Sequence, residues 1–129
     1  MMRHDMLADV MSKINNAERE GKSYCIVPSS KMIKNVLNVM QKNSYIGKMH
    51  EEKDVRGNRI KIELLGRVNC SKVIRPRFAV KASEFEKWEI RYLPAKGFGI
   101  LIFSTSKGVM SQKDTLEKNI GGRLLAFVY

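Results

Sequence analysis

The sequence predicts an α+β fold, in which a small N-terminal domain with the element order α-β-α-β-β is packed on a mostly β C-terminal domain with short helices. Two observations support this prediction. Up to Gly66 the apolar residues follow helix spacing and strand spacing in turn, whereas after Gly66 short extended runs, glycines and a proline dominate. A chain of 129 residues has room for one ordinary domain or two very small ones. We therefore expect domains at residues 1–66 and 67–129.

Residue spacing near the N-terminus predicts the first helix and the first strand. From Asp5 to Glu20 apolar residues recur every three or four positions, which is typical of an amphipathic helix, and Gly21 is placed to end it. The run Tyr24–Val27 favours a short strand, which Pro28 ends. The apolar face of the predicted helix consists of Met6, Leu7, Val10, Met11, Ile14 and Ala17.

A second helix and a hairpin complete the predicted N-terminal domain. Residues 45–48 return to an extended pattern, and Ile60–Leu64 alternates between apolar and polar residues as a half-buried strand does. The intervening sequence Arg56–Asn58 indicates a hairpin turn. Ser29 and Ser30 offer an N-cap to the helix, whose apolar face consists of Ile33, Val36, Leu37 and Met40.

The C-terminal half is predicted to be mostly β-structure. Pro76 interrupts an extended segment, which favours edge or irregular strands there. The predicted elements are, in order, extended structure at 73–80, a helix from Ser83 to Arg91, a strand from Phe98 to Phe103, a helix capped by Ser111 that runs to about Asn119, and a terminal strand entered through Gly121 and Gly122.

The chain is strongly basic. It contains 24 Lys and Arg against 13 Asp and Glu, which gives a net charge of +11. Residues 1–66 carry a net charge of +4 and residues 67–129 a net charge of +7. Such an excess repels itself unless a polyanion neutralises it, and the common polyanions are nucleic acids and acidic membrane surfaces. We therefore expect the main polyanion site in the C-terminal half.

Membrane-spanning, secreted and disulfide-rich classes are disfavoured. The longest apolar run, Leu124–Tyr129, is far shorter than the roughly 20 residues that span a bilayer, and the N-terminus lacks an apolar signal core. Cys25 and Cys70 lie 45 positions apart without a CxxC motif, so we expect two reduced, largely buried thiols. We expect a cytoplasmic protein that does not act at a membrane.

No arrangement of residues typical of catalysis is evident. The two histidines, His4 and His50, are remote in sequence from the hydroxyl-bearing run Ser104–Ser106. The glycines Gly97 and Gly99 do not complete a dinucleotide-binding fingerprint, because position 102 is Ile. We expect no enzymatic activity, no cofactor and no bound metal.

The stretch Gly97–Met110 has an unusual composition, in which an apolar run delivers the hydroxyls of Ser104–Ser106 and then Lys107 and Gly108. One interpretation is a capped strand-to-helix turn, because Ser and Thr satisfy the backbone groups of loops. The other is a surface for phosphates, 2′-hydroxyls and base edges, which Gly108 and the pair Gly121–Gly122 would allow to approach the backbone closely. The net charge favours RNA.

Motifs along nearly the whole chain resemble those of one known family. In chain order they are Asp5–Ala17, Pro28–Lys31, Gly97–Gly99, Ser104–Met110 and Gly121–Tyr129. By these motifs the chain resembles the S-eight family of universal small-subunit ribosomal proteins. Arg75–Phe78 and Glu86–Trp88 resemble the archaeal and eukaryotic branch rather than the bacterial one.

The resemblance implies a two-domain, non-enzymatic protein that binds a helix in the central domain of small-subunit ribosomal RNA. It also implies that the protein stabilises an irregular internal loop of that helix during assembly, beside neighbouring small-subunit ribosomal proteins. No apolar stripe is left over from the two predicted cores, so we expect a monomer when the protein is isolated. The RNA-binding residues carried over by position are Ser104, Thr105, Ser106, Lys107, Gly108, Gly121 and Gly122, with Ser30 and Lys31 from the N-terminal domain.

The chain departs from the family pattern at three places. Arg123 stands where bacterial members usually have a glutamate, so a carboxylate contact becomes a cationic one. Lys81 is the nearest equivalent of an aromatic residue that stacks on RNA in bacterial members. Thr115 and Leu116 replace a small residue followed by a basic one. We include Arg123 and Lys81 among the expected RNA-binding residues.

Two other functions stay open. The same surface would serve a regulator that binds messenger RNA, as bacterial members of the family do through a mimic of the ribosomal site. A basic module that binds DNA or acidic lipid is the weaker alternative. A duplex-DNA competitor that failed to displace RNA would exclude DNA binding.

Overall fold

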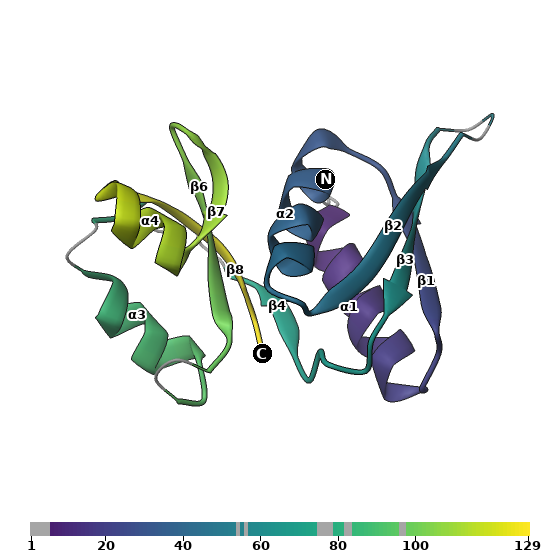
Figure 1. The fold of residues 1–129 in the computed structure, drawn as a ribbon, viewed down its shortest axis with the longest axis horizontal. Coiled ribbons are helices and arrows are strands. Elements are labelled where there is room, and N and C mark those ends of the chain that lie inside the picture. The colour runs from purple at the N-terminus through teal and green to yellow at the C-terminus, as the bar shows by residue number, and fades with distance from the viewer. Residues whose placement is uncertain (1–5, 54, 56, 75–78, 82–83, 96–97) are drawn as a thin grey trace, which may run out of the picture. The chain divides into compact units, whose positions relative to one another are not determined.

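The computed structural model describes residues 6–53, 55, 57–74, 79–81, 84–95 and 98–129. The chain forms two compact units, Met1–Ser71 and Lys72–Tyr129, and each is described by itself (Figure 1). The boundary at Gly66 stays a prediction. After Gly66, the backbone N–H groups of Val68 and Ser71 donate to side chains of α1.

The first unit has the predicted order α-β-α-β-β. Its elements are α1 (Met6–Arg19), β1 (Tyr24–Pro28), α2 (Lys31–Lys42), β2 (Ile46–Glu52) and β3 (Arg59–Leu64). The three strands form an antiparallel sheet in the order β1-β3-β2. Figure 1 shows both helices on the same face of this sheet.

The helices of the first unit form where their apolar faces and end signals coincide. In α1 the residues Leu7, Val10, Met11, Ile14 and Ala17 are buried, whereas Met6 is 43% exposed at the end of the helix. Gly21 follows with a φ of +72°, a conformation that glycine adopts without strain. The Ser30 hydroxyl accepts the Ile33 N–H at 3.2 Å, so the predicted N-cap of α2 is confirmed.

The segment after β3 is anchored to α1 by side chains. The Glu18 carboxylate accepts the backbone N–H groups of Gly66 and Val68 at 3.3 and 3.0 Å. Asn15 exchanges two hydrogen bonds with the Ser71 backbone, at 2.7 and 2.8 Å. Polar contacts therefore hold the exit from the first unit, in addition to the burial of Val68.

The second unit contains more strand than helix. Its elements are β4 (Ser71–Val73), β5 (Ala79–Val80), α3 (Phe85–Tyr92), β6 (Ile100–Thr105), β7 (Gly108–Ser111), α4 (Gln112–Lys118) and β8 (Gly122–Val128). The sheet has the order β4-β8-β6-β7, and β5 also pairs with β8. The core includes two runs of consecutive buried residues, Ile100–Phe103 in β6 and Leu124–Val128 in β8. Because successive side chains of a strand point to opposite faces of the sheet, consecutive buried residues mean that both faces are covered here.

The structure corrects the prediction for residues 98–111. The strand begins at Ile100 rather than Phe98 and continues through Thr105. A second strand, β7, follows after a two-residue turn, so the segment is a β-hairpin and not a strand-to-helix turn. Ser111 occupies the N-cap position of α4 as predicted, but its side chain makes no capping hydrogen bond.

Parts of the sequence prediction fall on residues outside the described set, namely Arg56, residues 75–78, Ser83 and Gly97. Glu84 occupies the N-cap position of α3. Cys25 is buried and Cys70 half-buried, and both are free thiols, as predicted.

Candidate functional site

A shallow hollow of about 740 Å³ lies on the second unit where β5, β8 and β6 come together. In the sheet, Gly122 pairs with Val80 of β5, and Arg123 pairs with Ser104 of β6. The lining residues come from four chain segments: Ala79, Val80, Lys81 and Glu84; Ser104, Thr105 and Ser106; Asn119; and Gly121, Gly122 and Arg123. Strand pairing thus brings together residues that lie up to 44 positions apart in the sequence, from Ala79 to Arg123.

The β6–β7 turn is stabilised by one of the three predicted hydroxyls. The Thr105 hydroxyl donates to the Gly108 carbonyl oxygen at 2.7 Å and accepts the Lys107 N–H at 3.2 Å. These two bonds span the turn at Ser106 and Lys107, and Gly108 follows with a φ of +117°. For Thr105 the capping interpretation therefore describes its hydroxyl better than a ligand contact does.

Two glycines are required by the close approach of the protein's own strands. A Cβ on Gly122 would lie 2.7 Å from the Ser104 carbonyl oxygen and 2.8 Å from Thr105 Cγ2. A Cβ on Gly121 would lie 2.7 Å from the Val80 carbonyl oxygen. The sequence interpretation attributed this glycine pair to the approach of a ligand, whereas the structure gives a packing reason for it.

Two hydroxyls and two cations remain available at the hollow. Within the described part of the chain no hydrogen bond involves the hydroxyls of Ser104, which is half-buried, or Ser106, which is exposed. The side chains of Lys81 and Arg123 are exposed and line the same hollow, and Lys107 is exposed at the adjacent turn. Hydroxyls that both donate and accept, beside cations, match the phosphates and 2′-hydroxyls of RNA.

Two polar residues of the hollow, Asn119 and Glu84, are not among the residues predicted from the sequence. Asn119 ends α4 in the left-handed conformation, with a φ of 52° and a ψ of 46°. An asparagine directly after a helix and before glycines is a known helix-ending signal, so its conformation was foreseeable although its place in the hollow was not. Glu84, at the start of α3, adds a carboxylate whose position depends on the pairing of β5 with β8.

The expected residues from the first unit do not belong to this hollow. The Ser30 hydroxyl is engaged as the N-cap of α2, and Lys31 is exposed in the first turn of that helix. Lys107 and Gly108 lie at the hairpin turn rather than in the lining.

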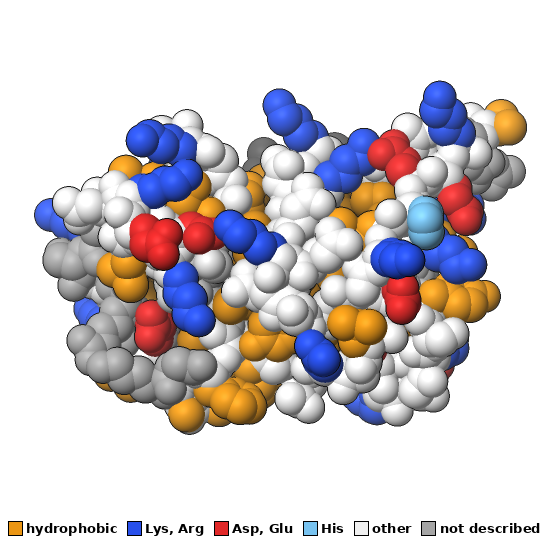
Figure 2. Space-filling model, in the orientation of Figure 1, with side chains coloured by type: hydrophobic (Ala, Val, Ile, Leu, Met, Phe, Trp, Pro, Cys, Tyr) orange, Lys and Arg blue, Asp and Glu red, His pale blue; other side chains and the backbone are white. Residues whose placement is uncertain are grey.

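Cations are spread widely over the face of the molecule that is drawn in Figure 2. Figure 2 shows Lys and Arg side chains across the visible face of both units rather than along one stripe. Within the described residues, no group of three His, Cys, Asp or Glu side chains is placed to hold a metal ion. None of the described helices has the length and apolar character needed to cross a membrane.

Comparison with known proteins gives full-length matches. The family model for ribosomal protein S8 matches residues 5–129. A protein of the archaeon Methanococcoides burtonii, named small ribosomal subunit protein uS8, is 48% identical over 130 residues, and the match covers 100% of both chains. The resemblance drawn from the sequence motifs is therefore confirmed.

Proposed function

This chain belongs to the ribosomal protein S8 family, and we propose that it binds directly to a helix in the central domain of small-subunit ribosomal RNA. As a member of this family it is a structural ribosomal protein rather than an enzyme. In the proposal it stabilises an irregular internal loop of that helix during assembly of the cytoplasmic ribosome. Neighbouring small-subunit proteins are its further partners.

The observation that carries the proposal is the hollow on the second unit. Two unengaged hydroxyls, Ser104 and Ser106, lie among the cations Lys81, Arg123 and Lys107. The cations attract phosphates without selecting a sequence, whereas the hydroxyls and nearby backbone groups recognise RNA shape and base edges. The net charge of +11 supplies the long-range attraction.

The proposed mechanism is a difference in affinity between RNA conformations. A shallow site with fixed groups binds a folded internal loop better than a looser one, because hydrogen-bond partners must be presented together. The protein then shifts the RNA towards the folded state by as much as its two affinities differ. The Thr105 hydroxyl stabilises the short β6–β7 turn, and β6 and β8 pack closely at Gly122. Both features keep the hydroxyls and cations of the hollow in place.

Footprinting of the full chain on purified small-subunit ribosomal RNA tests the proposal. We expect one protected helix in the central domain, and no displacement of the protein by duplex DNA. Protection spread over many helices, or protection confined to another domain of the RNA, would overturn the proposal.

Single substitutions separate the two kinds of contact. Ser106→Ala should lower affinity for the specific helix by about 1–3 kcal/mol and leave non-specific RNA binding almost unchanged. Lys107→Ala should weaken both and flatten the salt dependence by about one unit of log–log slope. Lys113→Ala, at an exposed lysine of α4 outside the hollow, is the matched control and should change specific binding little. Equal losses in the three variants would leave the hollow without a special role.

A further inference from the structure

The sheet of the first unit has two edge strands, and only one of them is protected. β3 is central, so β1 and β2 each have a free edge. On β2 the pairing shifts between Ile46 and Met49, and Gln41 Nε2 donates to the Gly47 carbonyl oxygen at 3.0 Å. Such irregularities and side-chain covers prevent unwanted pairing at a strand edge.

The edge of β1 is open between Ser23 and Pro28. The Leu64 N–H donates to the Ser23 carbonyl oxygen, and the Ser29 N–H donates to the Asn58 carbonyl oxygen, each at 2.9 Å. In the alternation of an antiparallel pair, residues 23, 25, 27 and 29 therefore bond to β3, while residues 24 and 26 direct their N–H and C=O groups away from it. Among the described residues, none forms a hydrogen bond with the outward N–H and C=O groups of residues 24 and 26.

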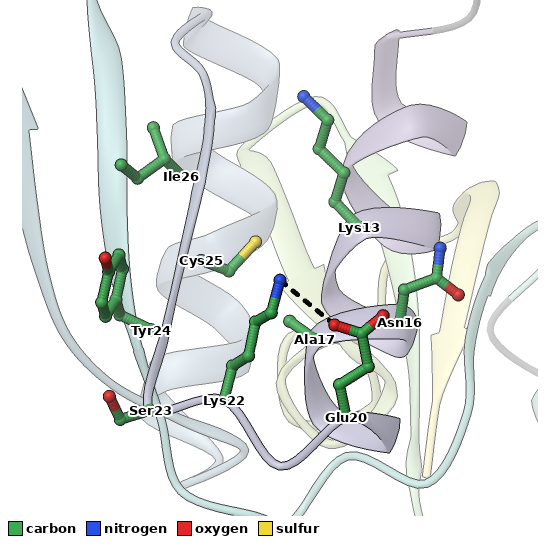
Figure 3. Close-up of a pocket in the computed structure, with 9 residues that line it drawn as sticks. All are labelled: Lys13, Asn16, Ala17, Glu20, Lys22, Ser23, Tyr24, Cys25 and Ile26. Atoms are coloured by element: carbon green, nitrogen blue, oxygen red, sulfur yellow. Dashed lines mark ion pairs between the residues drawn. The ribbon is translucent and has the colours of Figure 1, made fainter.

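A groove runs along this open edge. One face of α1 supplies Lys13, Asn16 and Ala17, and Glu20 follows directly after the end of this helix. Figure 3 shows Lys22 and Cys25 on the side of the strand that faces these residues, whereas Tyr24 and Ile26 point away from α1. This hollow, of about 610 Å³, shares Lys13 and Ile26 with a second one of about 380 Å³ that continues to Pro28, Asn58 and Arg59. We call the two together the β1 groove.

The β1 groove is cationic and partly apolar. Its lining includes the cations Lys13, Lys22 and Arg59 and, within the described residues, one carboxylate, Glu20, which Lys22 engages at 3.1 Å. Tyr24 and Ile26 are exposed by 49% and 38%. An acidic ligand with apolar side chains would neutralise this charge and cover this surface.

We propose that the β1 groove binds an extended, acidic segment of another protein, which adds to β1 as a fourth strand. Main-chain bonds to residues 24 and 26 would supply affinity, and Lys13 would supply charge selectivity. Pro28 lacks an N–H and ends the ladder, so the paired stretch is short. The strand edge presents carbonyl oxygens as well as N–H groups, and those oxygens repel phosphates. A peptide backbone therefore fits this edge better than RNA does.

The test uses the full chain and a fluorescein-labelled heptapeptide of alternating Glu and Val. Nuclear magnetic resonance titration should shift the amide signals of Tyr24 and Ile26 first. Two control peptides are matched to it: one with alternate backbone nitrogens methylated, which cannot complete the ladder, and one with Lys in place of Glu. We expect both controls to bind at least about threefold more weakly, in line with the loss of backbone bonds or of charge pairing.

Charge reversal in the protein provides the second measurement. Lys13→Glu should weaken binding of the acidic peptide about three- to tenfold, whereas Lys48→Glu, at an exposed lysine on the protected strand β2, should not. The wild-type titration does not depend on how these variants fold. Equal binding of the methylated peptide, or shifts confined to other residues, would overturn the proposal. Displacement of the peptide by a uridine decanucleotide would overturn it in favour of RNA. Dimerisation through the same amides in sedimentation would overturn it in favour of self-pairing.

Discussion

The two units bury their sheets in different ways. In the first unit, the helices α1 and α2, of 14 and 12 residues, each bury five residues, and β3 alternates strictly apart from a half-buried lysine. In the second unit, the helices have 8 and 7 residues, and β6 and β8 contain runs of four and five consecutive buried residues. The core of the first unit is therefore built from helix faces packed on a sheet, whereas the core of the second unit is built mainly from closely paired strands.

This difference affects where polar groups remain exposed for binding. Where strands approach closely, glycine replaces larger residues, and the close pairing of β5 and β6 with β8 at Gly121 and Gly122 brings hydroxyls and cations to one hollow. In the first unit, helices cover one face of the sheet and leave a strand edge open beside α1. The proposed RNA site and the proposed peptide groove thus follow from two different ways of covering a sheet.

The largest expected effect concerns the helix face of the first unit. Ile14 is fully buried, so Ile14→Asp places an unpaired charge in that core and should cost about 3–5 kcal/mol of unfolding free energy. Urea denaturation followed by circular dichroism measures the change. Met6→Asp, on the same helix at a residue 43% exposed, is the control and should cost far less. Equal costs would show that burial on this face contributes little to stability.

The elements of the first unit could be predicted because their signals are local. Residue spacing located both helices and β3, and Gly21 and Ser30 marked ends that the structure confirms. β2 was predicted only over residues 45–48 but extends to Glu52, because pairing with β3 recruits polar residues that have no strand pattern of their own. The local sequence therefore does not predict where β2 ends.

The second expected effect tests close strand contact. Gly122→Ala should cost about 1–3 kcal/mol, because the new Cβ would meet the Ser104 carbonyl oxygen, which belongs to a backbone fixed in the sheet. Gly47→Ala is the matched change in the first unit, where the new Cβ meets side-chain atoms of Glu63 at 3.0–3.2 Å rather than a backbone oxygen, and it should cost less than Gly122→Ala. Thermal denaturation of both variants decides the comparison. A neutral Gly122→Ala would mean that β6 and β8 can separate without loss.

The candidate site was predictable in its residues but not in its geometry. Ser104, Ser106, Lys81 and Arg123 come together as the motifs suggested, although their RNA contacts stay predictions. β7 was missed because its partner is β6 across a two-residue turn without an Asn-Gly or Asp-Gly signal. The packing role of the glycine pair depends on β5, which lies far away in the sequence.

A smaller effect is expected at the β6–β7 turn. Thr105→Val removes both hydroxyl bonds across the turn and should cost about 1–2 kcal/mol of unfolding free energy. Specific RNA affinity, measured well below the melting temperature, should fall less than in Ser106→Ala, because the Thr105 hydroxyl already bonds within the protein. The opposite order, with affinity lost and stability unchanged, would assign Thr105 to direct RNA contact.

The smallest effect concerns the β2–β3 hairpin of the first unit. An ion pair links this hairpin to α2, whereas the β6–β7 hairpin is stabilised by the Thr105 hydroxyl. Lys34 Nζ lies 2.5 Å from Glu51 Oε2, and Asn58 Nδ2 donates to Glu51 Oε1 at 2.8 Å. The bond from Lys34 is the main reason that the pKa of Glu51 lies below its usual range. Because the folded-state pKa is lower than that of an unfolded Glu, about 4.3, the pair stabilises the fold above that pH.

This stabilisation should fade as the pH falls through the folded-state pKa of Glu51. Melting temperatures of the wild type and Lys34→Met, measured from pH 7 down to about pH 2, should therefore differ slightly at neutral pH and converge in acid. Both side chains are partly exposed, so added salt should also reduce the difference at neutral pH. Thr105→Val offers the contrast, because a hydroxyl does not titrate and its cost should not change with pH through the Glu51 contact. A Lys34→Met difference that persisted in acid would show that the lysine acts through its aliphatic chain, and the two hairpins would then differ less than their polar contacts suggest.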